Sequence, residues 1–438
     1  QFFEYDSWKN KAENNRLNQS FIFAERGVIQ DRNGVLLAWN QTDPAQSDYA
    51  SRVYRSEEGT HGLIGYVKYP RKDKSGFYYN MQYAGADGIE EYFDPLLQGE
   101  AGLKLTETDV KGNVIYESVR RPPLDGENIT LTIDARLQEA MYSSIKELAR
   151  RSGFVGGAGM VMDVNTGEVL ASVSFPEYDS NIMTAGTSTE TIKGYLSDNR
   201  KLFLDRVSRG VYTPGSIVKP VLALAALNEG VIAPNTKIES TGELRVPNPY
   251  KPGEYTVFND WRANGWTDIR EAIAVSSDIY FYQIGGGFGS QKGLGITKID
   301  EYAKDFGMGV AIKKGFFRGN AGVIPTPEWK AKNFNGDIWR VGDTYNTSIG
   351  QYGFQITPAQ AVRSIAAIAN GGTVVNPHIF KQINAKEGVV DGHASKVSSY
   401  EEEQDENWKV DITNQSDFDI IREGMRMTVT QGTMGALN

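Results

Sequence analysis

A serine and a lysine with the spacing of a catalytic pair occur at Ser216-Ile217-Val218-Lys219. Residues three apart in a helix face each other, so the amine of Lys219 would lie beside the hydroxyl of Ser216. A neutral lysine amine can take the proton of a serine hydroxyl and make its oxygen a nucleophile. The motif therefore indicates acyl-transfer chemistry at Ser216, with Lys219 as the base.

The flanking residues predict that this motif opens a buried helix. Pro214 and Gly215 end the preceding segment, and the apolar run 221–227 follows the motif. Pro220 is compatible with a helix only near its start, where amide donors lack intrahelical partners. There the helix dipole favours developing negative charge, and burial lowers the pKa of Lys219 from its usual value of about 10.4. For this motif alone, a helix cap with a lysine whose amine reaches solvent explains the residues equally well.

A second Ser-x-x-Lys motif, Ser143 with Lys146, is interpreted as part of a solvated helix face. Two fixed positions of common residue types recur by chance in a chain of this length. The helix that carries this motif has one apolar stripe, which includes neither residue and is formed by Leu137, Met141, Ile145 and Leu148.

The composition excludes several other kinds of site. The 438 residues contain no cysteine, which excludes disulfides, thiolate catalysis and cysteine-based metal centres. The three histidines, His61, His378 and His393, lack the neighbours of a metal site or a serine triad, so we interpret them as structural or surface residues. A formal net charge of −9 argues against a general nucleic-acid-binding surface.

Local patterns predict two hairpins and several helices. The hairpins are expected at 28–38, around Asn33-Gly34, and at 160–173, around Asn165-Thr166-Gly167, because each turn offers a glycine where a positive φ is needed. Apolar runs predict helices over 217–227, 269–284 and 358–369.

A further motif, Ser276-Ser277-Asp278, follows the first one along the chain. Ser-x-Asn or Ser-x-Asp after Ser-x-x-Lys is the second element of serine acyl-transferases that recognise penicillin. With it, the chain resembles the class B penicillin-binding proteins, and Asp278, Asp260-Trp261 and Trp329-Lys330 resemble their elongation-type members. Other motifs continue in family order: Arg26-Gly27 with Asp31-Arg32-Asn33-Gly34, Gly88-Ile89-Glu90, Gly99-Glu100-Ala101-Gly102, Leu131-Thr132-Ile133-Asp134 with Leu137-Gln138, Gly342-Asp343-Thr344, Ser348-Ile349-Gly350-Gln351, and Thr357-Pro358 with Gln360.

The resemblance implies a multidomain fold of mixed α+β and α/β character. We expect an elongated, β-rich N-terminal pedestal domain over residues 1–150, with a small head subdomain at about 56–102. Residues 151–438 would form a penicillin-binding, β-lactamase-like transpeptidase domain, with a central antiparallel sheet flanked by helices. We expect the C-terminal part of that domain to lie beyond Asn438.

Residue by residue, the resemblance implies four catalytic side chains. Ser216 would be the acylated nucleophile, Lys219 its base, and Ser276 a proton relay to the leaving amine. Asp278 would bind the substrate amide or orient Lys219. We expect no cofactor. Some branches of the family build a metal site from His and Cys near the second motif, but Asn264 and Trp266 occupy that neighbourhood here, so no metal is expected.

A third family motif, Lys-Thr-Gly or Lys-Ser-Gly on a strand beside the cleft, is not found after the nucleophile. Lys74-Ser75-Gly76 has the letters but precedes Ser216, so we interpret it as unrelated. The segment 425–433 resembles what precedes the third motif in the family. We therefore expect the motif after Asn438, and activity of the complete protein rather than of this chain alone.

The function implied by the resemblance is peptidoglycan D,D-transpeptidation during cell-wall elongation, with acylation of the same serine by β-lactams. It further implies stem peptides as substrates, a SEDS-family membrane glycosyltransferase as partner, and a place on the extracytoplasmic face of the bacterial inner membrane, with an anchor upstream of Gln1. Two alternatives remain: a β-lactamase or β-lactam sensor with the same Ser216, Lys219 and Ser276, and a scaffold whose transferase domain only binds partners.

Overall fold

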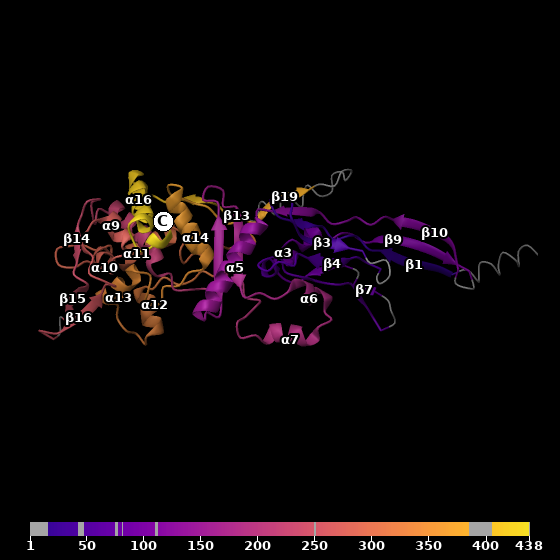
Figure 1. The fold of residues 1–438 in the computed structure, drawn as a ribbon, viewed down its shortest axis with the longest axis horizontal. Coiled ribbons are helices and arrows are strands. Elements are labelled where there is room, and N and C mark those ends of the chain that lie inside the picture. The colour runs from indigo at the N-terminus through magenta and orange to yellow at the C-terminus, as the bar shows by residue number, and fades with distance from the viewer. Residues whose placement is uncertain are drawn as a thin grey trace, which may run out of the picture. The chain divides into compact units, whose positions relative to one another are not determined.

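The computed structural model describes residues 16–42, 48–74, 78–80, 82–109, 113–248, 251–384 and 405–437. The chain forms two compact units, which are considered separately (Figure 1). Unit 1 comprises Gln1–Gly157, Leu170–Phe203 and Ile379–Glu402, and unit 2 comprises Ala158–Val169, Leu204–His378 and Glu403–Asn438. No helix within the described ranges is both long enough and apolar enough to cross a membrane.

Unit 1 is built around a five-stranded sheet. In spatial order its strands are β19 (Phe380–Asn384), β11 (Asn128–Leu131), β2 (Ile29–Gln30), β3 (Leu36–Gln41) and β4 (Ser51–Tyr54). The antiparallel pair β2–β3 confirms the first predicted hairpin. Gly34 has φ +84°, and Asp31 Oδ1 accepts hydrogen bonds from the backbone amides of Asn33 and Val35 at 2.8 Å each. The turn is therefore held by its own aspartate.

A second sheet of unit 1 has the order β1 (Arg16–Ile22), β9 (Gly102–Thr108) and β10 (Val114–Arg121), seen side by side in Figure 1. The remaining elements are short: strands β5 (Val67–Lys68), β6 (Arg71–Lys72), β7 (Tyr78–Asn80) and β8 (Ala84–Gly85), and helices α2 (His61–Ile64), α3 (Gly88–Tyr92), α4 (Asp94–Leu97), α6 (Ser180–Ala185) and α7 (Thr189–Ser197).

A buried ion cluster ties these short elements to the larger sheet. Glu90 on α3 accepts from Arg26 Nε at 2.6 Å and from Arg52 Nε, on β4, at 2.8 Å, and all three side chains are fully buried. Burial alone would raise the pKa of Glu90, but the two guanidinium groups outweigh it and hold that pKa below its usual value. Removal of either arginine would therefore leave the buried charge of Glu90 less compensated.

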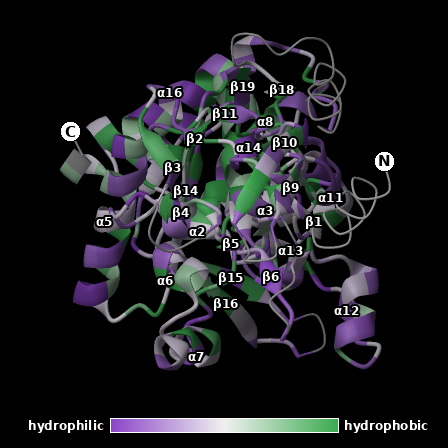
Figure 2. Ribbon diagram, turned by 90° about the vertical axis from the view of Figure 1, so that its right-hand side faces the viewer, coloured by the Kyte–Doolittle hydropathy of each residue, from purple (hydrophilic) through white to green (hydrophobic). Residues whose placement is uncertain are grey.

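Helix α5 (Ala135–Ser152) corrects the predicted apolar stripe. Its buried side chains are Ala135, Gln138, Tyr142 and Ala149, whereas Leu137 and Leu148 are 36% and 45% exposed. A polar residue lies inside because the Gln138 side chain donates to the carbonyls of Gly59 and Ser172 and accepts from the Ser172 amide. Figure 2 accordingly colours α5 in both purple and green.

The core of unit 2 is helical. At its centre, every side chain of α8 (Lys219–Asn228) from Lys219 to Leu227 is buried. The other helices are η1 (Gly215–Val218), α9 (Ile269–Ala274), α10 (Asp278–Gly286), α11 (Gly295–Asp305), α12 (Pro327–Asn333), α13 (Val341–Ser348), α14 (Pro358–Ala369), α16 (Ser416–Thr430) and η2 (Gly435–Leu437). The predicted helices over 217–227 and 358–369 are thereby confirmed.

Between residues 157 and 409, the strands that the structure describes, other than β19, pair in twos. The pairs are β12 (Gly157–Met162) with β13 (Val169–Phe175), β14 (Ile238–Ser240) with β17 (Gly265–Thr267), β15 (Glu243–Pro247) with β16 (Tyr255–Asn259), and β18 (Thr373–Val374) with β20 (Trp408–Lys409). The first pair is the second predicted hairpin, with Gly167 at φ +84° in its turn.

The predicted continuous helix over 269–284 is wrong. It is divided into α9 and α10 at Val275–Ser277. Ser276 has φ +53°, which no right-handed helix accommodates, and Ser277 is the N-cap of α10, with Oγ accepting from the Tyr280 amide at 3.4 Å. The Ser276-Ser277-Asp278 motif thus forms the break between the two helices.

The compact units differ in extent from the predicted division at about residue 150. Strand β19 pairs with β11, Ile383 opposite Ile129, so the chain returns to unit 1 after residue 378. Residues 170–203 also belong to unit 1, where Tyr178 Oη donates to Asp87 Oδ2 at 2.7 Å. The division into a pedestal over 1–150, a head at about 56–102 and a transpeptidase domain over 151–438 stays a prediction.

Candidate active site

Ser216 lies in η1, a single 3₁₀ turn that leads directly into α8. Its side chain is exposed, while Lys219 and Pro220 are already buried. Pro220 is the second residue of α8, where its missing amide proton breaks no helical hydrogen bond. The prediction that Ser216 stands at the start of a buried helix is confirmed.

A close glycine contact fixes the backbone just before Ser216. The Gly215 amide donates to the Gly350 carbonyl at 3.0 Å, and Gly350 has φ +73°. A Cβ atom on Gly350 would lie 2.2 Å from the Gly215 carbonyl oxygen, so only glycine fits there. Two residues earlier, Ser348 Oγ donates to the Phe281 carbonyl at 2.9 Å and joins α13 to α10. The Ser348-Ile349-Gly350-Gln351 motif therefore supports the site from outside it.

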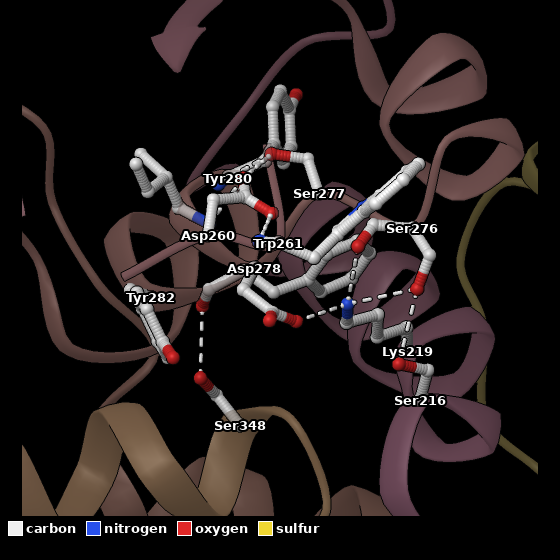
Figure 3. A network of polar contacts seen from close by, with 12 residues as sticks. Ser216, Lys219, Asp260, Trp261, Ser276, Ser277, Asp278, Tyr280, Tyr282 and Ser348 are labelled. Carbon is white, nitrogen blue, oxygen red and sulfur yellow. Dashed lines mark hydrogen bonds and ion pairs between the residues drawn. The ribbon is translucent and has the colours of Figure 1, made fainter. Parts of the chain in front are cut away.

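Lys219 points into the interior, toward the break between α9 and α10 (Figure 3). It is 2% exposed, and its Nζ donates to Asp278 Oδ1 at 2.6 Å, to the Ser276 carbonyl at 2.9 Å and to Ser276 Oγ at 3.1 Å. Burial lowers the pKa of Lys219 below its usual value, and the neighbouring carboxylate of Asp278 opposes this. An amine that reaches solvent, the alternative for this motif, does not describe Lys219.

Ser276 stands between Lys219 and Ser216. Its hydroxyl accepts from Lys219 Nζ and donates to Ser216 Oγ at 3.0 Å, so the three polar groups form one continuous series (Figure 3). The structure therefore brings together all four predicted side chains, Ser216, Lys219, Ser276 and Asp278. The series offers a path for a proton between the Ser216 hydroxyl and the Lys219 amine.

A buried carboxylate, Asp260, lies on the other side of the same motif. Its Oδ2 accepts from Ser240 Oγ at 2.9 Å, from Ser277 Oγ at 2.7 Å and from Asn264 Nδ2 at 3.2 Å. One carboxylate with two hydroxyls and an amide is not a donor set for zinc, which takes Cys, His and carboxylates. The described ranges contain no group of three or more His, Cys, Asp or Glu side chains that could hold a metal.

The segment predicted to precede the third motif reaches the end of α9. Helix α16 packs on α9, with Arg270 Nε donating to Glu423 Oε2 at 2.5 Å. After α16 the Thr433 amide donates to the Ala274 carbonyl at 3.2 Å, and a Cβ on Gly432 would lie 2.0 Å from the same oxygen. The chain after α16 therefore contacts Ala274, which precedes Ser276 by two residues in the sequence.

The other residues singled out from the sequence lie elsewhere. In unit 1, Ser143 is exposed and Lys146 pairs with Glu58, which confirms the solvated helix face. Lys74 also belongs to unit 1, while Ser75 and Gly76 lie outside the described residues. His61 is buried, with Nδ1 accepting from the Ser180 amide at 3.4 Å, and His393 lies outside the described residues.

Sequence reasoning missed the roles of Ser240, Ser277 and Asn264 around Asp260. In the sequence, Asp260 stands out only as part of a family pattern. Its partners come from β14, from the loop before β17 and from the N-cap of α10, so no short spacing connects them. Ser277 alone carried a signal, because a serine just before a helical run is a typical N-cap.

The geometry of the site agrees with the protein family whose models match the chain. The family model of the penicillin-binding protein transpeptidase domain matches residues 157–437, and that of the penicillin-binding protein dimerisation domain matches residues 45–131. The chain therefore belongs to the penicillin-binding proteins with a transpeptidase domain. The resemblance to class B members of the elongation type, and the fold of pedestal plus transpeptidase domain, are confirmed.

Three known proteins illustrate the similarity. The peptidoglycan D,D-transpeptidase MrdA of Haemophilus influenzae is 36% identical over 346 residues, which cover 76% of this chain and 50% of that protein. The crystal structure of Pseudomonas aeruginosa PBP2 in complex with WCK 5153 is 28% identical, with a TM-score of 0.73 and coverage of 96% and 83%. A chain of a peptidoglycan synthase complex that coordinates polymerization and crosslinking is 25% identical, with a TM-score of 0.76 and coverage of 99% and 82%. This chain spans about half the length of the curated relatives it matches.

Proposed function

We propose that the protein containing this chain is a peptidoglycan D,D-transpeptidase that works through an acyl-enzyme on Ser216. The observation that carries the proposal is the hydrogen-bonded series from Lys219 Nζ through Ser276 Oγ to Ser216 Oγ. A relative 36% identical to the chain bears the same activity in its name. β-Lactams would acylate the same serine, because their strained amide mimics the acyl donor.

In the first step, Ser216 Oγ attacks the carbonyl of the penultimate D-alanine of a donor stem peptide. The Ser216 proton passes to neutral Lys219, directly or through Ser276, and then to the nitrogen of the leaving D-alanine. The C–N bond breaks, an ester forms on Ser216, and D-alanine departs as the amine. An acceptor amine then attacks the ester, forms the cross-link and returns the proton to Ser216. The backbone amide of Ser216 would contribute to the oxyanion hole.

The electrostatics of the site support Lys219 as the base. Burial favours the neutral amine, which is the form that accepts a proton. Asp278 holds Nζ at 2.6 Å, so it orients the amine and at the same time keeps the pKa of Lys219 from falling further. A base whose pKa is moderated in this way can both take and return a proton during one turnover.

We further propose that the protein acts on the extracytoplasmic face of the bacterial inner membrane, with a SEDS-family glycosyltransferase as partner. The support is the similarity to a chain of a peptidoglycan synthase complex that coordinates polymerization and crosslinking. The regions of the chain that match family models are a dimerisation domain and a transpeptidase domain.

The test is covalent labelling of the full-length protein by a fluorescent penicillin, followed by intact mass. Labelling is expected for the parent and for Ser143→Ala, which removes the serine of the solvated Ser-x-x-Lys copy, and is expected to vanish in Ser216→Ala. Release of D-alanine from a stem pentapeptide should follow the same pattern. Persistent labelling of Ser216→Ala would exclude Ser216 as the nucleophile. Fast release of hydrolysed drug would favour a β-lactamase, and a parent without any labelling would favour a scaffold.

A further inference from the structure

We propose that Asp260 is a positioning residue, which holds the Ser276-Ser277-Asp278 turn in its reactive geometry from the side opposite to Lys219. The inference rests on the proposed function, since the turn matters only if Ser276 and Asp278 take part in acyl transfer. In this role Asp260 would not contact the substrate. Its carboxylate also takes no part in the proton path between Ser216 and Lys219.

Asp260 is the common acceptor of a buried polar cluster. The aspartate is 9% exposed, Ser240 is 2% exposed and Ser277 is completely buried. Besides the two serine hydroxyls and Asn264 Nδ2, Asp260 Oδ2 accepts from the Ile279 amide at 3.2 Å. These hydrogen bonds outweigh the effect of burial and keep the pKa of Asp260 below its usual value, so the group is a carboxylate at neutral pH.

The turn needs outside support because its backbone is strained. Ser276 is one of the few non-glycine residues with positive φ, at +53°, a region that L side chains rarely adopt. The first amides of α10 have no partner within that helix. Asp260 accepts the Ile279 amide and the Ser277 hydroxyl, which places a negative charge at the positive end of α10.

The next residue, Trp261, holds the other end of the same turn. Its backbone amide donates to Asp260 Oδ1 at 2.9 Å, and its indole Nε1 donates to the Val275 carbonyl at 2.9 Å (Figure 3). The Asp260-Trp261 pair therefore grips the residue before Ser276 and the residue after it. Ser276 is left free to face Ser216 and Lys219.

Asp260 also acts on Lys219 through its charge. Asp278 and Asp260 are the carboxylates that raise the pKa of Lys219 against the effect of burial. Removal of the Asp260 charge should therefore lower that pKa further. If neutral Lys219 is the base, the rise of the acylation rate with pH should move to lower pH. A residue that only stabilised the fold would not produce this shift.

The experiment compares acylation rates by fluorescent penicillin in the full-length protein as a function of pH. Asp260→Asn keeps the shape but removes the charge, and Ser277→Ala removes the hydroxyl through which Asp260 acts. The matched control is Asp134→Asn, because Asp134 Oδ1 also caps a helix, α5, by accepting from the Arg136 and Leu137 amides at 3.0 and 3.3 Å.

At a pH above the range in which the acylation rate rises, we expect Asp260→Asn to be acylated at least ten times more slowly than the parent. The rise of its acylation rate should occur at lower pH than in the parent. Ser277→Ala should slow acylation without changing the pH at which the acylation rate rises. The double variant should be little slower than Asp260→Asn, because coupled residues are non-additive. Asp134→Asn should lower the melting temperature and leave the rate and its pH profile unchanged.

Trp261→Phe keeps the test decisive if Asp260→Asn does not fold. The indole is 54% exposed, so the variant should fold, and loss of the Val275 contact should slow acylation several-fold. Unchanged acylation in Trp261→Phe, or an Asp260→Asn variant that matches Asp134→Asn in rate and pH profile, would overturn the inference. A parent that is not labelled at all would instead refute the proposed function.

Discussion

Replacement of Glu177 by glutamine is expected to remove a pH-dependent loss of stability from unit 1. Burial raises the pKa of Glu177 to about 7, and the nearby charge of Glu58 acts in the same direction. The backbone amides of Gly59 and Gly62 donate to the two carboxylate oxygens at 2.5 and 3.0 Å and only partly oppose this. Glu177 is thus a carboxyl group that titrates near neutral pH.

The direction of this change in stability follows from the linkage between proton binding and folding. Because the folded state has the higher pKa, it binds the proton more tightly than the unfolded chain does. The stabilisation is fully present below the usual pKa of 4.5 and is lost as the pH rises through about 7. The pKa difference of about 2.5, at roughly 1.4 kcal/mol for each pKa unit, gives about 3.5 kcal/mol at most. Water that reaches the partly buried side chain reduces this value.

The assay is thermal unfolding of the parent and Glu177→Gln from pH 5 to pH 8. Glutamine is neutral throughout and keeps one acceptor oxygen for the Gly59 or Gly62 amide. The variant should therefore gain stability relative to the parent as the pH rises, by roughly 2 to 4 °C per kcal/mol. Glu147→Gln is the control, since Glu147 is exposed and pairs with Arg150. Parallel curves for Glu177→Gln and the parent over the whole range would refute the reasoning.

Three further outcomes are expected. Gly350→Ala should abolish measurable penicillin acylation, which the rate of labelling reports. Residue 350 has φ +73°, and a Cβ atom there would lie 2.2 Å from the Gly215 carbonyl oxygen. Arg52→Ala should destabilise the protein by about 3 to 5 kcal/mol in urea unfolding, because it leaves buried Glu90 undercompensated. The acylation rate of the parent should rise with pH to a plateau reached below the usual lysine pKa of 10.5, because burial lowers the pKa of Lys219; stopped-flow labelling across pH measures it.

Matched variants separate these effects from general damage. Gly230 also has a positive φ, +63°, but a Cβ there meets nothing within 4 Å, so Gly230→Ala should retain most acylation. Arg150 forms an exposed pair with Glu147, so Arg150→Ala should change stability by less than about 1 kcal/mol. Equal losses in Gly350→Ala and Gly230→Ala would show that φ, and not the close contact, governs the first result.

The site was predictable where chemistry and local structure use the same residues. Pro220 marks the start of α8, so it also places Lys219 in the first turn of that helix and Ser216 in the turn just before it. Asn33-Gly34 predicts its hairpin because the turn needs a positive φ that glycine supplies. In both cases the information is contained in a few consecutive residues.

Other features depend on contacts between distant residues, which spacing does not reveal. Helix α5 buries Gln138 instead of Leu137 because the carbonyls of Gly59 and Ser172, elsewhere in the chain, accept from its side-chain amide. The break between α9 and α10 interrupts an apolar run that resembles one helix. Asp260, from a separate loop, accepts from Ser277 beside the strained Ser276. Hydrophobic periodicity registers neither kind of polar partner.

The complete burial of α8 limits how this protein can vary. Each side chain from Lys219 to Leu227 packs in the core of unit 2, so truncation of a residue such as Leu222 or Leu224 costs about 2 to 5 kcal/mol, a large part of the stability of a typical domain. By contrast, Tyr212 and Ile217, close to Ser216 in sequence, are each 44% exposed. We therefore expect mutations that alter the reaction of Ser216 with acylating compounds to occur at exposed positions such as Tyr212 and Ile217. The sequence of α8 should vary little.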